Sequence, residues 1–507
     1  MLAFLLKFFP ESPTTILILR LMQLLPVVLI LYLINLLIRK KFQFDVFLYS
    51  FLVLGFNKWF IDKTSEVRPD ILLLVFSLAG LNFWIQGLDR YKKIFLFYSG
   101  LFFGLAFTTS PKVSILLIAL FISFIIHFKL GHVGKKITDL LPAFLYFFTG
   151  IIIPISVLIF YLLYNNGFEQ FIECFYIGIL KNPNYFSPAS TLRHSIYINF
   201  AFWITGLMGM FLSLFNYLDN QFCGKKNSIY NITILSIIVI QYVIFHWFMP
   251  APYPQSALII FPLISIYCGL TLTKMEEYIR MKWRNYTKIV IFSFILILIF
   301  IPPYLSYLLD DKISHNKNHS QKEKINFILE NTDADARIFD CQGFYMYRYP
   351  ACYYGVLVKG TLLSIQQDVI KYDIISDLIK NNCMLAVPDY RWSMLPENVI
   401  RFFESNYVYI DKWNVLIPGK IIEFENSNVT EQFDPLPDYP YIITTYPPNK
   451  SILLDGIIVS TPTPFEKGNH VIAIHDNVEK VFILPEFSLK GDFDILNGND
   501  LSKATLK

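Results

Sequence analysis

The sequence predicts a multi-span α-helical membrane domain of about ten spans, followed by a small extracytoplasmic α/β domain and a β-sandwich-like module. Three observations predict this fold class. Of the 507 residues, 54% are hydrophobic and 16% are charged, and the mean hydropathy is +0.47, far too apolar for a soluble protein of this size. Apolar runs of spanning length stop near residue 308. Beyond that residue, strand and helix patterns alternate, and short β runs take over from about residue 420.

The membrane domain, residues 1–308, is built from apolar runs that approach the roughly 20 residues needed to cross the hydrocarbon layer. Prolines inside some of these runs are tolerated in membrane helices and do not change the number of spans. The predicted spans lie near 15–38, 44–61, 70–87, 94–110, 112–128, 139–164, 195–217, 229–248, 254–272 and 288–308.

The orientation follows from the basic residues in the connecting loops. One set of alternate loops carries sixteen Lys and Arg residues and the opposite set carries seven. Because cytoplasmic loops are enriched in Lys and Arg, the first set is expected to be cytoplasmic. The region after residue 308 is then expected outside the cytoplasm, and the protein is expected to be a multi-pass protein of the cytoplasmic (inner) membrane.

The same orientation places residues 1–14 outside, although Met1 to Phe9 form an apolar stub too short to span. Two interpretations are open. The stub is the remainder of an upstream helix and loop that this chain lacks, or it is a natural short tail.

The extracytoplasmic region divides by its pattern into three parts: an α/β domain at 309–418, a β-sandwich-like module at 419–491 and a polar tail at 492–507. Cys341 and Cys352 lie in the first part and could pair in an oxidising compartment. The predicted helices are 321–330, 368–380 and one from residue 396, and the predicted strands are 337–340, 383–389, 451–459, 470–474 and 481–484.

The candidate site is the stretch from Arg68 to Lys112, which holds two predicted spans joined by a basic turn. Both ends of such a hairpin emerge on one face of the membrane, so Asp70 and Lys112 are expected to lie on the same outer side. Taken separately, Asp70 has the position of a helix cap and Lys112 that of a snorkelling lysine. Together they suit sugar transfer, because a lipid phosphate needs fixed cations and an acceptor hydroxyl needs a carboxylate to orient or deprotonate it.

Further cations are predicted on the outer side, where the positive-inside rule disfavours them. Their gathering indicates an anion-binding surface. Arg20 lies within the first span, where a charge either faces a polar cavity or snorkels outward. The predicted substrate-binding cations beyond Arg68 and Lys112 are Arg20, Lys58, Arg193 and His194.

The sequence lacks both GxGxxG and GxxxxGK[ST], which disfavours an ATP-driven pump. Spacings typical of a zinc site or of a Ser-His-Asp triad are also missing. No cofactor is therefore predicted, and a divalent metal has no supporting ligand cluster.

The two ends of the stretch, Arg68-Pro69-Asp70 and Gly100-Leu-Phe-Phe-Gly-Leu-Ala-Phe-Thr-Thr-Ser-Pro-Lys112, resemble the GT-C glycosyltransferases of family 39, the protein mannosyltransferase and aminoarabinose-transferase type. The resemblance implies a GT-C-like membrane domain and a polyprenyl-phosphate sugar donor. It implies that Asp70 matches the acidic residue at the head of the family's "PD" helix and that Lys112 binds the lipid phosphate, and Asp70 is the predicted catalytic residue of this chain. Tyr253 and Gln255 fall in a stretch similar to the family's donor-phosphate loop, without the basic residue often found there.

The chain departs from the family pattern at its start. Family members carry a first span and an outer loop with an acidic catalytic residue, and this chain begins at what resembles the far end of that loop. The resemblance therefore implies a truncated or misassigned start, or a site in which Asp70 acts alone.

The expected function is transfer of a hexosyl- or pentosyl-type sugar from a polyprenyl-phosphate donor to an extracytoplasmic acceptor, with inversion at the anomeric carbon. The acceptor is a lipid, a glycan or a protein, and no nucleic acid is expected as a partner. An alternative is a non-catalytic membrane protein that binds or transports lipid-linked glycans. A polysaccharide polymerase or ligase has similar topology, but its large outer loop usually lies between spans.

Overall fold

The computed structural model describes most of the chain. The described residues are 9–90, 92–129, 137–172, 196–222, 229–247, 258–282, 290, 292–293, 296–297, 301, 305, 317–341, 347–352, 359–368, 370–410, 414–423, 431–433, 440–446, 449–465, 470–474 and 478–486. Most of the predicted span at 288–308, the apolar stub up to residue 8 and the polar tail at 492–507 lie outside them.

The chain forms two compact units. The helical unit comprises Leu17–Leu180 and Asn184–His315, and the C-terminal unit comprises Asn316–Lys507 together with Met1–Ile16 and Lys181–Pro183. The domain boundaries predicted from the sequence stay predictions, and the two units are described separately below.

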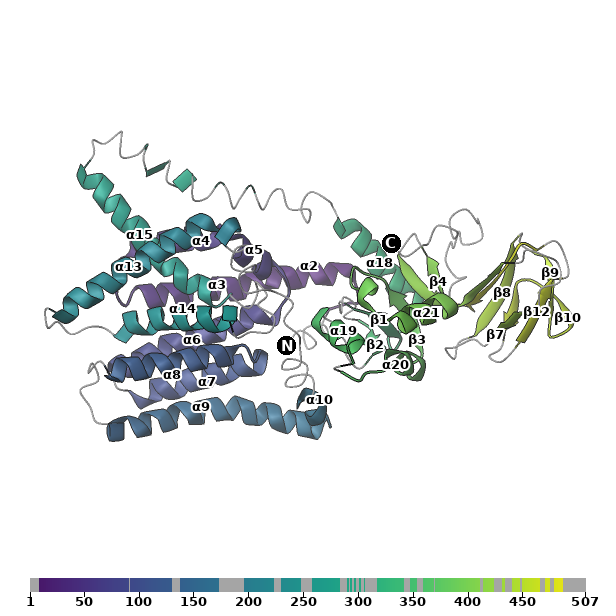
Figure 1. The fold of residues 1–507 in the computed structure, drawn as a ribbon, viewed down its shortest axis with the longest axis horizontal. Helices are drawn as coiled ribbons and strands as arrows, with labels where there is room; N and C mark the ends of the chain where they lie inside the picture. Colours follow the sequence, from purple (N-terminus) through teal and green to yellow (C-terminus); the bar gives the residue numbers. More distant parts are fainter. Residues whose placement is uncertain are drawn as a thin grey trace. The chain divides into compact units, whose positions relative to one another are not determined.

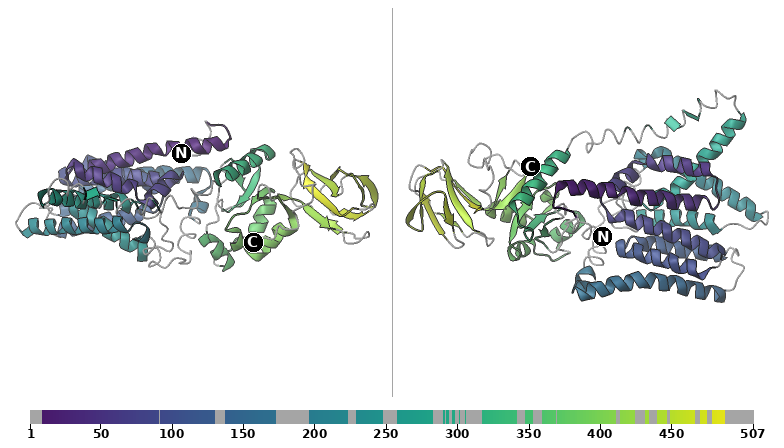
Figure 2. Two further views of the ribbon diagram at one scale, coloured as in Figure 1. Left: turned by 90° about the horizontal axis from the view of Figure 1, so that it is seen from above. Right: turned by 180° about the vertical axis from the view of Figure 1, so that it is seen from behind.

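The helical unit consists of helices that follow the predicted apolar runs closely and lie side by side in one bundle (Figures 1 and 2). The helices are α2 (Pro13–Met22), α3 (Leu24–Ile38), α4 (Phe44–Gly55), α5 (Lys58–Ser65), α6 (Pro69–Arg90), α7 (Lys93–Thr109), α8 (Val113–Lys129), α9 (Ile137–Tyr164), α10 (Phe168–Ile172), α13 (Phe200–Phe222), α14 (Ile229–Trp247) and α15 (Ile260–Lys282).

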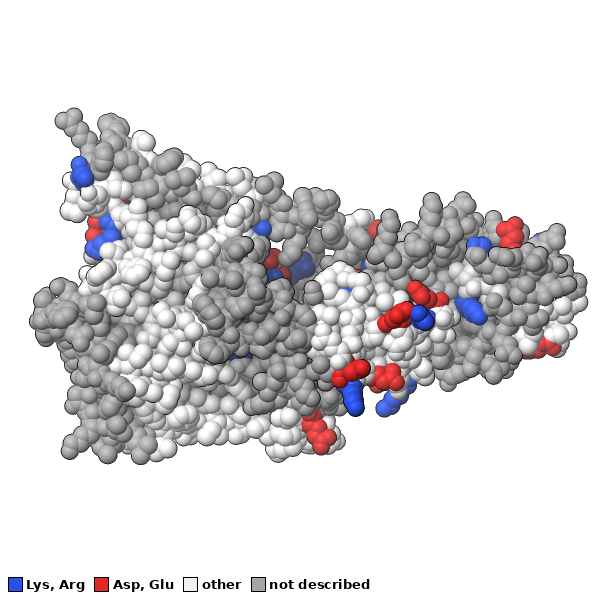
Figure 3. Space-filling view, viewed as in Figure 1, with Lys and Arg blue, Asp and Glu red and all other residues white. Residues whose placement is uncertain are grey.

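Large apolar side chains cover much of the outside of this unit, as a lipid-facing bundle requires. Leu25, Val28, Val157 and Phe160 are more than 60% exposed. On the face drawn in Figure 3, charged side chains are sparse over the described surface of the bundle and gather near the end of α15. The unit therefore has the surface of a membrane protein.

Among the described residues, three helices are long and apolar enough to cross a membrane: Pro13–Ile38, Pro69–Arg90 and Phe144–Tyr164. A fourth candidate is the pair α4 and α5, and shorter apolar helices lie at Lys93–Thr109, Val113–Ile126, Phe200–Asn216 and Thr233–Ile244. The predicted count of about ten spans is therefore not confirmed.

The predicted span at 44–61 is not one straight helix. It is broken after Gly55, and α4 and α5 are bent by 71°. Asn57 causes the restart, because its backbone is extended and its side-chain oxygen accepts a hydrogen bond from the Phe60 N–H at 3.0 Å. This cap satisfies one of the free donors at the start of α5 and turns that helix away from the axis of α4.

Helix α6 is the centre of the bundle. In its most apolar stretch 78% of the residues are buried, against 22% in Phe144–Tyr164, and it packs against α3, α7 and α14. Two hydrogen bonds join it to neighbouring helices. Asn82 Nδ2 donates to the carbonyl oxygen of Leu33 at 3.0 Å, and Ser99 Oγ donates to that of Gly80 at 2.8 Å. These bonds fix α6 against α3 and α7.

The helices α7 and α9 approach each other through glycines. A Cβ atom added at Gly100 would overlap the carbonyl oxygen of Phe147, and one added at Gly150 would overlap that of Phe97. Small residues allow such close backbone contact between membrane helices. Gly100 and Gly104, part of the motif that carries the family resemblance, therefore have a packing role here.

The C-terminal unit begins with a mixed five-stranded sheet of order β2-β1-β3-β5-β4, in which β1 is parallel to β2 and β3, and β5 is antiparallel to β3 and β4. A core that includes Phe339, Leu378, Trp392 and Phe403 joins helices to this sheet. The elements are α18 (Lys317–Asn331), β1 (Arg337–Asp340), β2 (Tyr349–Pro350), α19 (Lys359–Gln366), α20 (Ile374–Lys380), β3 (Cys383–Val387), η3 (Trp392–Met394), α21 (Glu397–Asn406), β4 (Tyr407–Ile410) and β5 (Val415–Pro418).

Most local predictions for this region are correct, with two differences. The helix predicted at 368–380 starts only at Ile374, because Asp373 caps it by accepting a hydrogen bond from the Ser376 N–H. Cys341 and Cys352 are buried free thiols. The disulfide considered from the sequence is absent between these two described residues.

Two antiparallel four-stranded sheets follow, of order β10-β9-β12-β7 and β11-β8-β13-β6. Both contribute to one core that includes Ile443, Ile452, Ile472 and Val481, so they form a sandwich (Figures 1 and 2). The strands are β6 (Lys420–Glu423), β7 (Glu431–Phe433), β8 (Tyr441–Tyr446), β9 (Ser451–Leu454), β10 (Ile457–Ser460), β11 (Thr463–Phe465), β12 (His470–Ile474) and β13 (Lys480–Pro485).

The stretch predicted as a β run at 451–459 is a hairpin. Strands β9 and β10 pair with Leu454 opposite Ile457, and Asp455 and Gly456 form the two-residue turn between them. Both turn residues have positive φ, of 52° and 80°. An Asp-Gly pair suits this geometry, which matches the twist of the strands.

The segment before the first span belongs to the C-terminal unit. The guanidinium group of Arg348 is buried and donates a hydrogen bond from Nη1 to Oε2 of Glu11 at 2.9 Å. The Tyr347 hydroxyl donates to the carbonyl oxygen of Ser12 at 3.1 Å. Residues 11 and 12 are thus part of the fold of the α/β region.

Candidate active site

The site is built around the first turn of α6. Pro69 occupies the first helical position, where its fixed φ suits a helix and its missing N–H costs nothing. Asp70 follows it, and α6 and α7 run in opposite directions as a packed pair. Lys112, just beyond α7 and ahead of α8, is thereby returned to the end of the bundle at which α6 begins.

Asp70 joins the two ends of the hairpin. Its Oδ1 accepts a hydrogen bond from Lys112 Nζ at 2.7 Å, and its Oδ2 accepts one from Arg68 Nε at 3.2 Å. The Asp70 side chain is 5% exposed, whereas Arg68 and Lys112 are 31% and 28% exposed. The structure thus brings together the three residues singled out at the ends of the predicted hairpin. A buried carboxylate holds two cations that remain accessible.

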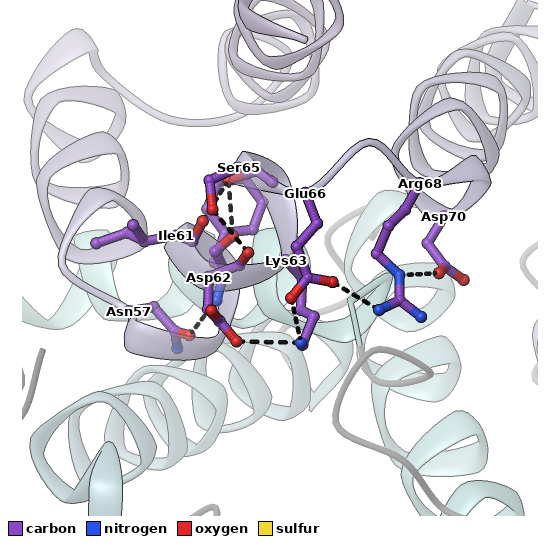
Figure 4. Close-up of polar contacts among 10 residues, drawn as sticks. Asn57, Ile61, Asp62, Lys63, Ser65, Glu66, Arg68 and Asp70 are labelled. Carbon is purple, nitrogen blue, oxygen red and sulfur yellow. Dashed lines mark hydrogen bonds and ion pairs between the residues drawn. The ribbon is translucent and has the colours of Figure 1, made fainter. Parts of the chain in front are cut away.

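The charges continue into the segment before α6 (Figure 4). Glu66 Oε2 accepts from Arg68 Nη1 at 2.6 Å, and Glu66 Oε1 accepts from Lys63 Nζ at 2.9 Å. Lys63 Nζ also lies 3.1 Å from Oδ2 of Asp62. These side chains form an alternating series, named here the ionic cluster: Asp62, Lys63, Glu66, Arg68, Asp70 and Lys112.

Sequence reasoning missed half of the ionic cluster. Asp62, Lys63 and Glu66 lie in α5 and the turn after it, a region predicted partly as span and partly as loop. A usable signal was present, since the acidic residues 62, 66 and 70 alternate with the basic residues 63 and 68 just ahead of the central helix. Opposite charges so close in the chain can pair with one another.

The pairing shifts the titration of Glu66 and Arg68. Burial alone raises the pKa of a carboxyl group, but hydrogen bonds from Arg68 and Lys63 and their positive charges outweigh it, so the pKa of Glu66 is lowered. Burial correspondingly lowers the pKa of Arg68, but Glu66 and Asp70 outweigh it, so that pKa is raised. Both groups are therefore ionised at neutral pH.

The other predicted site residues are not seen in the ionic cluster. Arg20 is exposed on α2, and Lys58 begins α5, where its backbone N–H donates to Asn199 Oδ1 at 3.2 Å. Arg193, His194, Tyr253 and Gln255 lie outside the described residues, as does most of the outer loop that carries the first two. The roles predicted for these six residues stay predictions.

The described part of the chain contains no group of three or more His, Cys, Asp or Glu side chains placed to hold a metal ion. The carboxylates of the ionic cluster are each paired with cations. The accessible side chains of Arg68 and Lys112 have the charged hydrogen-bond donors that an anion would need.

Residues 1–160 match a family model described as dolichyl-phosphate-mannose-protein mannosyltransferase. The first 160 residues carry the pattern of this mannosyltransferase family. The predicted resemblance to GT-C glycosyltransferases is thereby confirmed, and the whole ionic cluster lies within the matched mannosyltransferase segment. The match supports glycosyl transfer in general and a lipid-linked sugar donor in general.

Among solved structures, the chain is similar to the Archaeoglobus fulgidus oligosaccharyltransferase in its complex with Zn and sulfate. The two are 13% identical, with a TM-score of 0.40, and the alignment covers 78% of this chain and 60% of that one. This likeness is too distant to assign any residue. No curated protein matches the chain significantly.

Proposed function

We propose that this protein transfers a sugar from a polyprenyl-phosphate donor to an acceptor hydroxyl on the extracytoplasmic side of the cytoplasmic membrane. The observation that carries the proposal is the set of contacts of Asp70 with Lys112 and Arg68, inside the segment that matches the mannosyltransferase family. The acceptor belongs to a lipid, a glycan or a protein.

The main requirement of the reaction is that the negative charge of the leaving group is stabilised. The acceptor oxygen forms a bond to the anomeric carbon as the bond from that carbon to the phosphate oxygen breaks, and a single displacement of this kind inverts the anomeric centre. The acceptor hydroxyl gives up its proton to the departing phosphate or to water. The electron pair leaves with the lipid phosphate, whose negative charge grows. Lys112 and Arg68 would stabilise that charge, since both are held by Asp70 and remain accessible to a ligand.

Asp70 was predicted as the catalytic carboxylate, and the proposal keeps it in the site with a positioning role. Its contacts favour positioning, because both of its oxygens already accept hydrogen bonds from cations. In this proposal Asp70 therefore orients Lys112 and Arg68 toward the donor phosphate.

The remaining predicted residues complete the proposal. Arg193, His194, Tyr253 and Gln255 are proposed to contact the donor phosphate or the sugar from the outer loops, and Lys58 and Arg20 to contribute positive charge near the same surface. The donor is proposed to carry a hexose or a pentose.

A second candidate is a protein that binds or transports lipid-linked glycans without transferring them. The contacts of Asp70 favour it in one respect, since a buried and doubly paired carboxylate supplies no ready general base.

A transfer assay separates the two candidates. Membranes containing the full chain receive a panel of radiolabelled polyprenyl-phosphate sugars, and label is counted in lipid, glycan and protein fractions. Asp70→Ala and Lys112→Ala should each reduce transfer by roughly tenfold or more, the effect of losing one charge-assisted contact. Lys274→Ala is the matched control, because its exposed pair with Glu277 lies on α15, outside the ionic cluster. Undiminished transfer in both test variants would contradict the proposal, and donor binding without transfer by the unaltered protein would favour the second candidate.

A further inference from the structure

We propose that Glu66 is an internal anion that occupies the cations of this site and so sets its affinity for the donor phosphate. The inference rests on the proposed function, because it takes the ligand to be a lipid phosphate: a diester in the sugar-loaded donor, and a monoester in the product that transfer releases. It adds a residue that neither the sequence pattern nor the family match singled out.

The carboxylate of Glu66 contacts the cations as a bound phosphate group would. Its two oxygens accept from Lys63 Nζ at 2.9 Å and from Arg68 Nη1 at 2.6 Å, so one planar anion bridges two cations. Arginine and lysine bind phosphate oxygens and carboxylate oxygens through the same charge-assisted hydrogen bonds. A phosphate that approaches Arg68 therefore competes with Glu66 for the same donors.

The charge balance within the ionic cluster favours this competition. Its six side chains comprise three carboxylates and three cations, whose formal charges sum to zero. These six side chains offer a phosphate no net positive charge of their own, so its attraction to Arg68 grows when one carboxylate gives up its cations. Without that exchange, attraction to Arg68 is offset by repulsion from Glu66.

Glu66 can release its cations more easily than Asp70 can. The Asp70 side chain is 5% exposed and belongs to the first turn of α6, whereas the Glu66 side chain is 32% exposed and follows the last residue of α5. Its carboxylate can move into water at little cost, while that of Asp70 would have to leave a buried position between two helices. Asp70 thus holds the cations, and Glu66 occupies them until the donor arrives.

The test compares phosphate binding by full-length variants in detergent. The probes are farnesyl phosphate, a short polyprenyl phosphate, and inorganic phosphate, which lacks the lipid. Glu66→Gln keeps the shape of the side chain and removes its charge, so the Kd for farnesyl phosphate should fall on the order of tenfold. The same direction is expected for inorganic phosphate. Glu277→Gln, which removes a similar paired carboxylate on α15, should leave both Kd values unchanged.

Glu66→Asp retains the charge and should bind farnesyl phosphate about as weakly as the unaltered protein. This variant shows whether a change at residue 66 alters binding through the lost charge or through a disturbed fold. A purely structural role for Glu66 would make Glu66→Gln bind more weakly, so unchanged or weaker binding overturns the inference. The proposed function is tested separately by Lys112→Met. If the unaltered protein binds farnesyl phosphate and Lys112→Met weakens that binding, the phosphate-binding role that the proposed function gives to Lys112 stands whatever Glu66 does. If Lys112→Met binds as the unaltered protein does, or neither binds, the proposed function fails and the inference fails with it.

Discussion

Lys112 Nζ lies 2.7 Å from Oδ1 of Asp70, although the two residues are 42 positions apart in the chain. The contact closes the hairpin of α6 and α7 at the end where α6 begins. It also fixes an ammonium group beside the guanidinium group of Arg68, which binds the other oxygen of the same carboxylate. Two cations held by one buried anion have their positions set before a ligand binds, which is what the proposed phosphate site requires.

The first prediction concerns the coupling of these two residues. Asp70→Asn removes the charge that holds both cations, and Lys112→Met removes one cation but keeps an apolar stem of similar length. A double-mutant cycle in the free energy of unfolding should give a coupling of about 1.5–3 kcal/mol, the range for a hydrogen bond to a charged group. The measurement is thermal or denaturant unfolding of the purified protein in detergent. Additive effects of the two substitutions would show that the contact contributes nothing in solution.

The second prediction concerns acid pH. The pKa of Glu66 is lowered from its ordinary value of 4.5, despite burial, by its hydrogen bonds with Arg68 and Lys63. A carboxyl group with a lowered pKa in the folded state stabilises the fold above its unfolded pKa, and this stabilisation is lost as the pH falls through the folded value. The unaltered protein should therefore be more stable than Glu66→Gln at pH 7, and the difference should shrink below about pH 4.5.

The Tm of both proteins, followed from pH 7 to pH 3, checks this expectation. Glu277→Gln supplies the comparison for an exposed pair, whose carboxylate is 44% accessible and more strongly screened by solvent. A difference in Tm between the unaltered protein and Glu66→Gln that stays constant from pH 7 to pH 3 would be evidence against the ion pairs of Glu66.

The third prediction concerns the close backbone contact between α7 and α9, called the seam below. Gly100→Ala should destabilise the protein by about 1–3 kcal/mol, because the new methyl group overlaps the Phe147 carbonyl oxygen and forces the helices apart. Gly55→Ala is the matched control, since nothing lies within 4 Å of an added Cβ at that exposed end of α4. It should be neutral or stabilise by up to about 1 kcal/mol through helix propensity. Equal losses from both substitutions, measured as Tm in detergent, would argue against the close seam.

The sequence allowed part of this site to be predicted and not the rest, for a physical reason. Asp70 and Lys112 were predictable because a helical hairpin returns to the side on which it starts, whatever its packing. The partners Lys63 and Glu66 depend on the 71° bend between α4 and α5, which periodicity does not reveal in a run that is apolar up to residue 61. Asn57, which caps the restart, was the local sign of that bend.

The same limit applies to the C-terminal unit. Individual strands such as β1 and β3 were predictable from their apolar runs, but the shared core of the sheets was not. Phe482 and Leu484 on β13 pack with Val408 and Ile417 of β4 and β5, across the boundary predicted at 418/419. Contacts between residues so far apart in the chain depend on the final packing, so the local hydrophobic pattern does not predict them.

The fourth prediction concerns the pair Glu11 and Arg348, which are 337 positions apart and belong to the same compact unit. The Arg348 side chain is 3% exposed and also donates to Oγ1 and to the carbonyl oxygen of Thr332, each at 2.8 Å. Arg348→Ala leaves these buried acceptors unpaired and should cost about 2–4 kcal/mol of stability. The Tm of the C-terminal unit should fall on the order of 5–10 °C.

Glu11→Gln should cost less, about 1 kcal/mol or below, because the Glu11 side chain is 48% exposed and water replaces part of the lost interaction. Arg401→Ala is the matched control, since its ion pair with Glu397 is exposed on both sides and contributes little. The experiment is differential scanning calorimetry of the full chain, with each variant compared at the same detergent concentration. Arg348→Ala unfolding no earlier than Arg401→Ala would mean that the segment before α2 does not contribute to the fold of the α/β region. A low Tm for Arg348→Ala together with a small change in Tm for Glu11→Gln would instead show that the contacts of Arg348 with Thr332 provide most of the stabilisation. The contact of Glu11 with Arg348 would then mainly hold the segment before α2 against the α/β region.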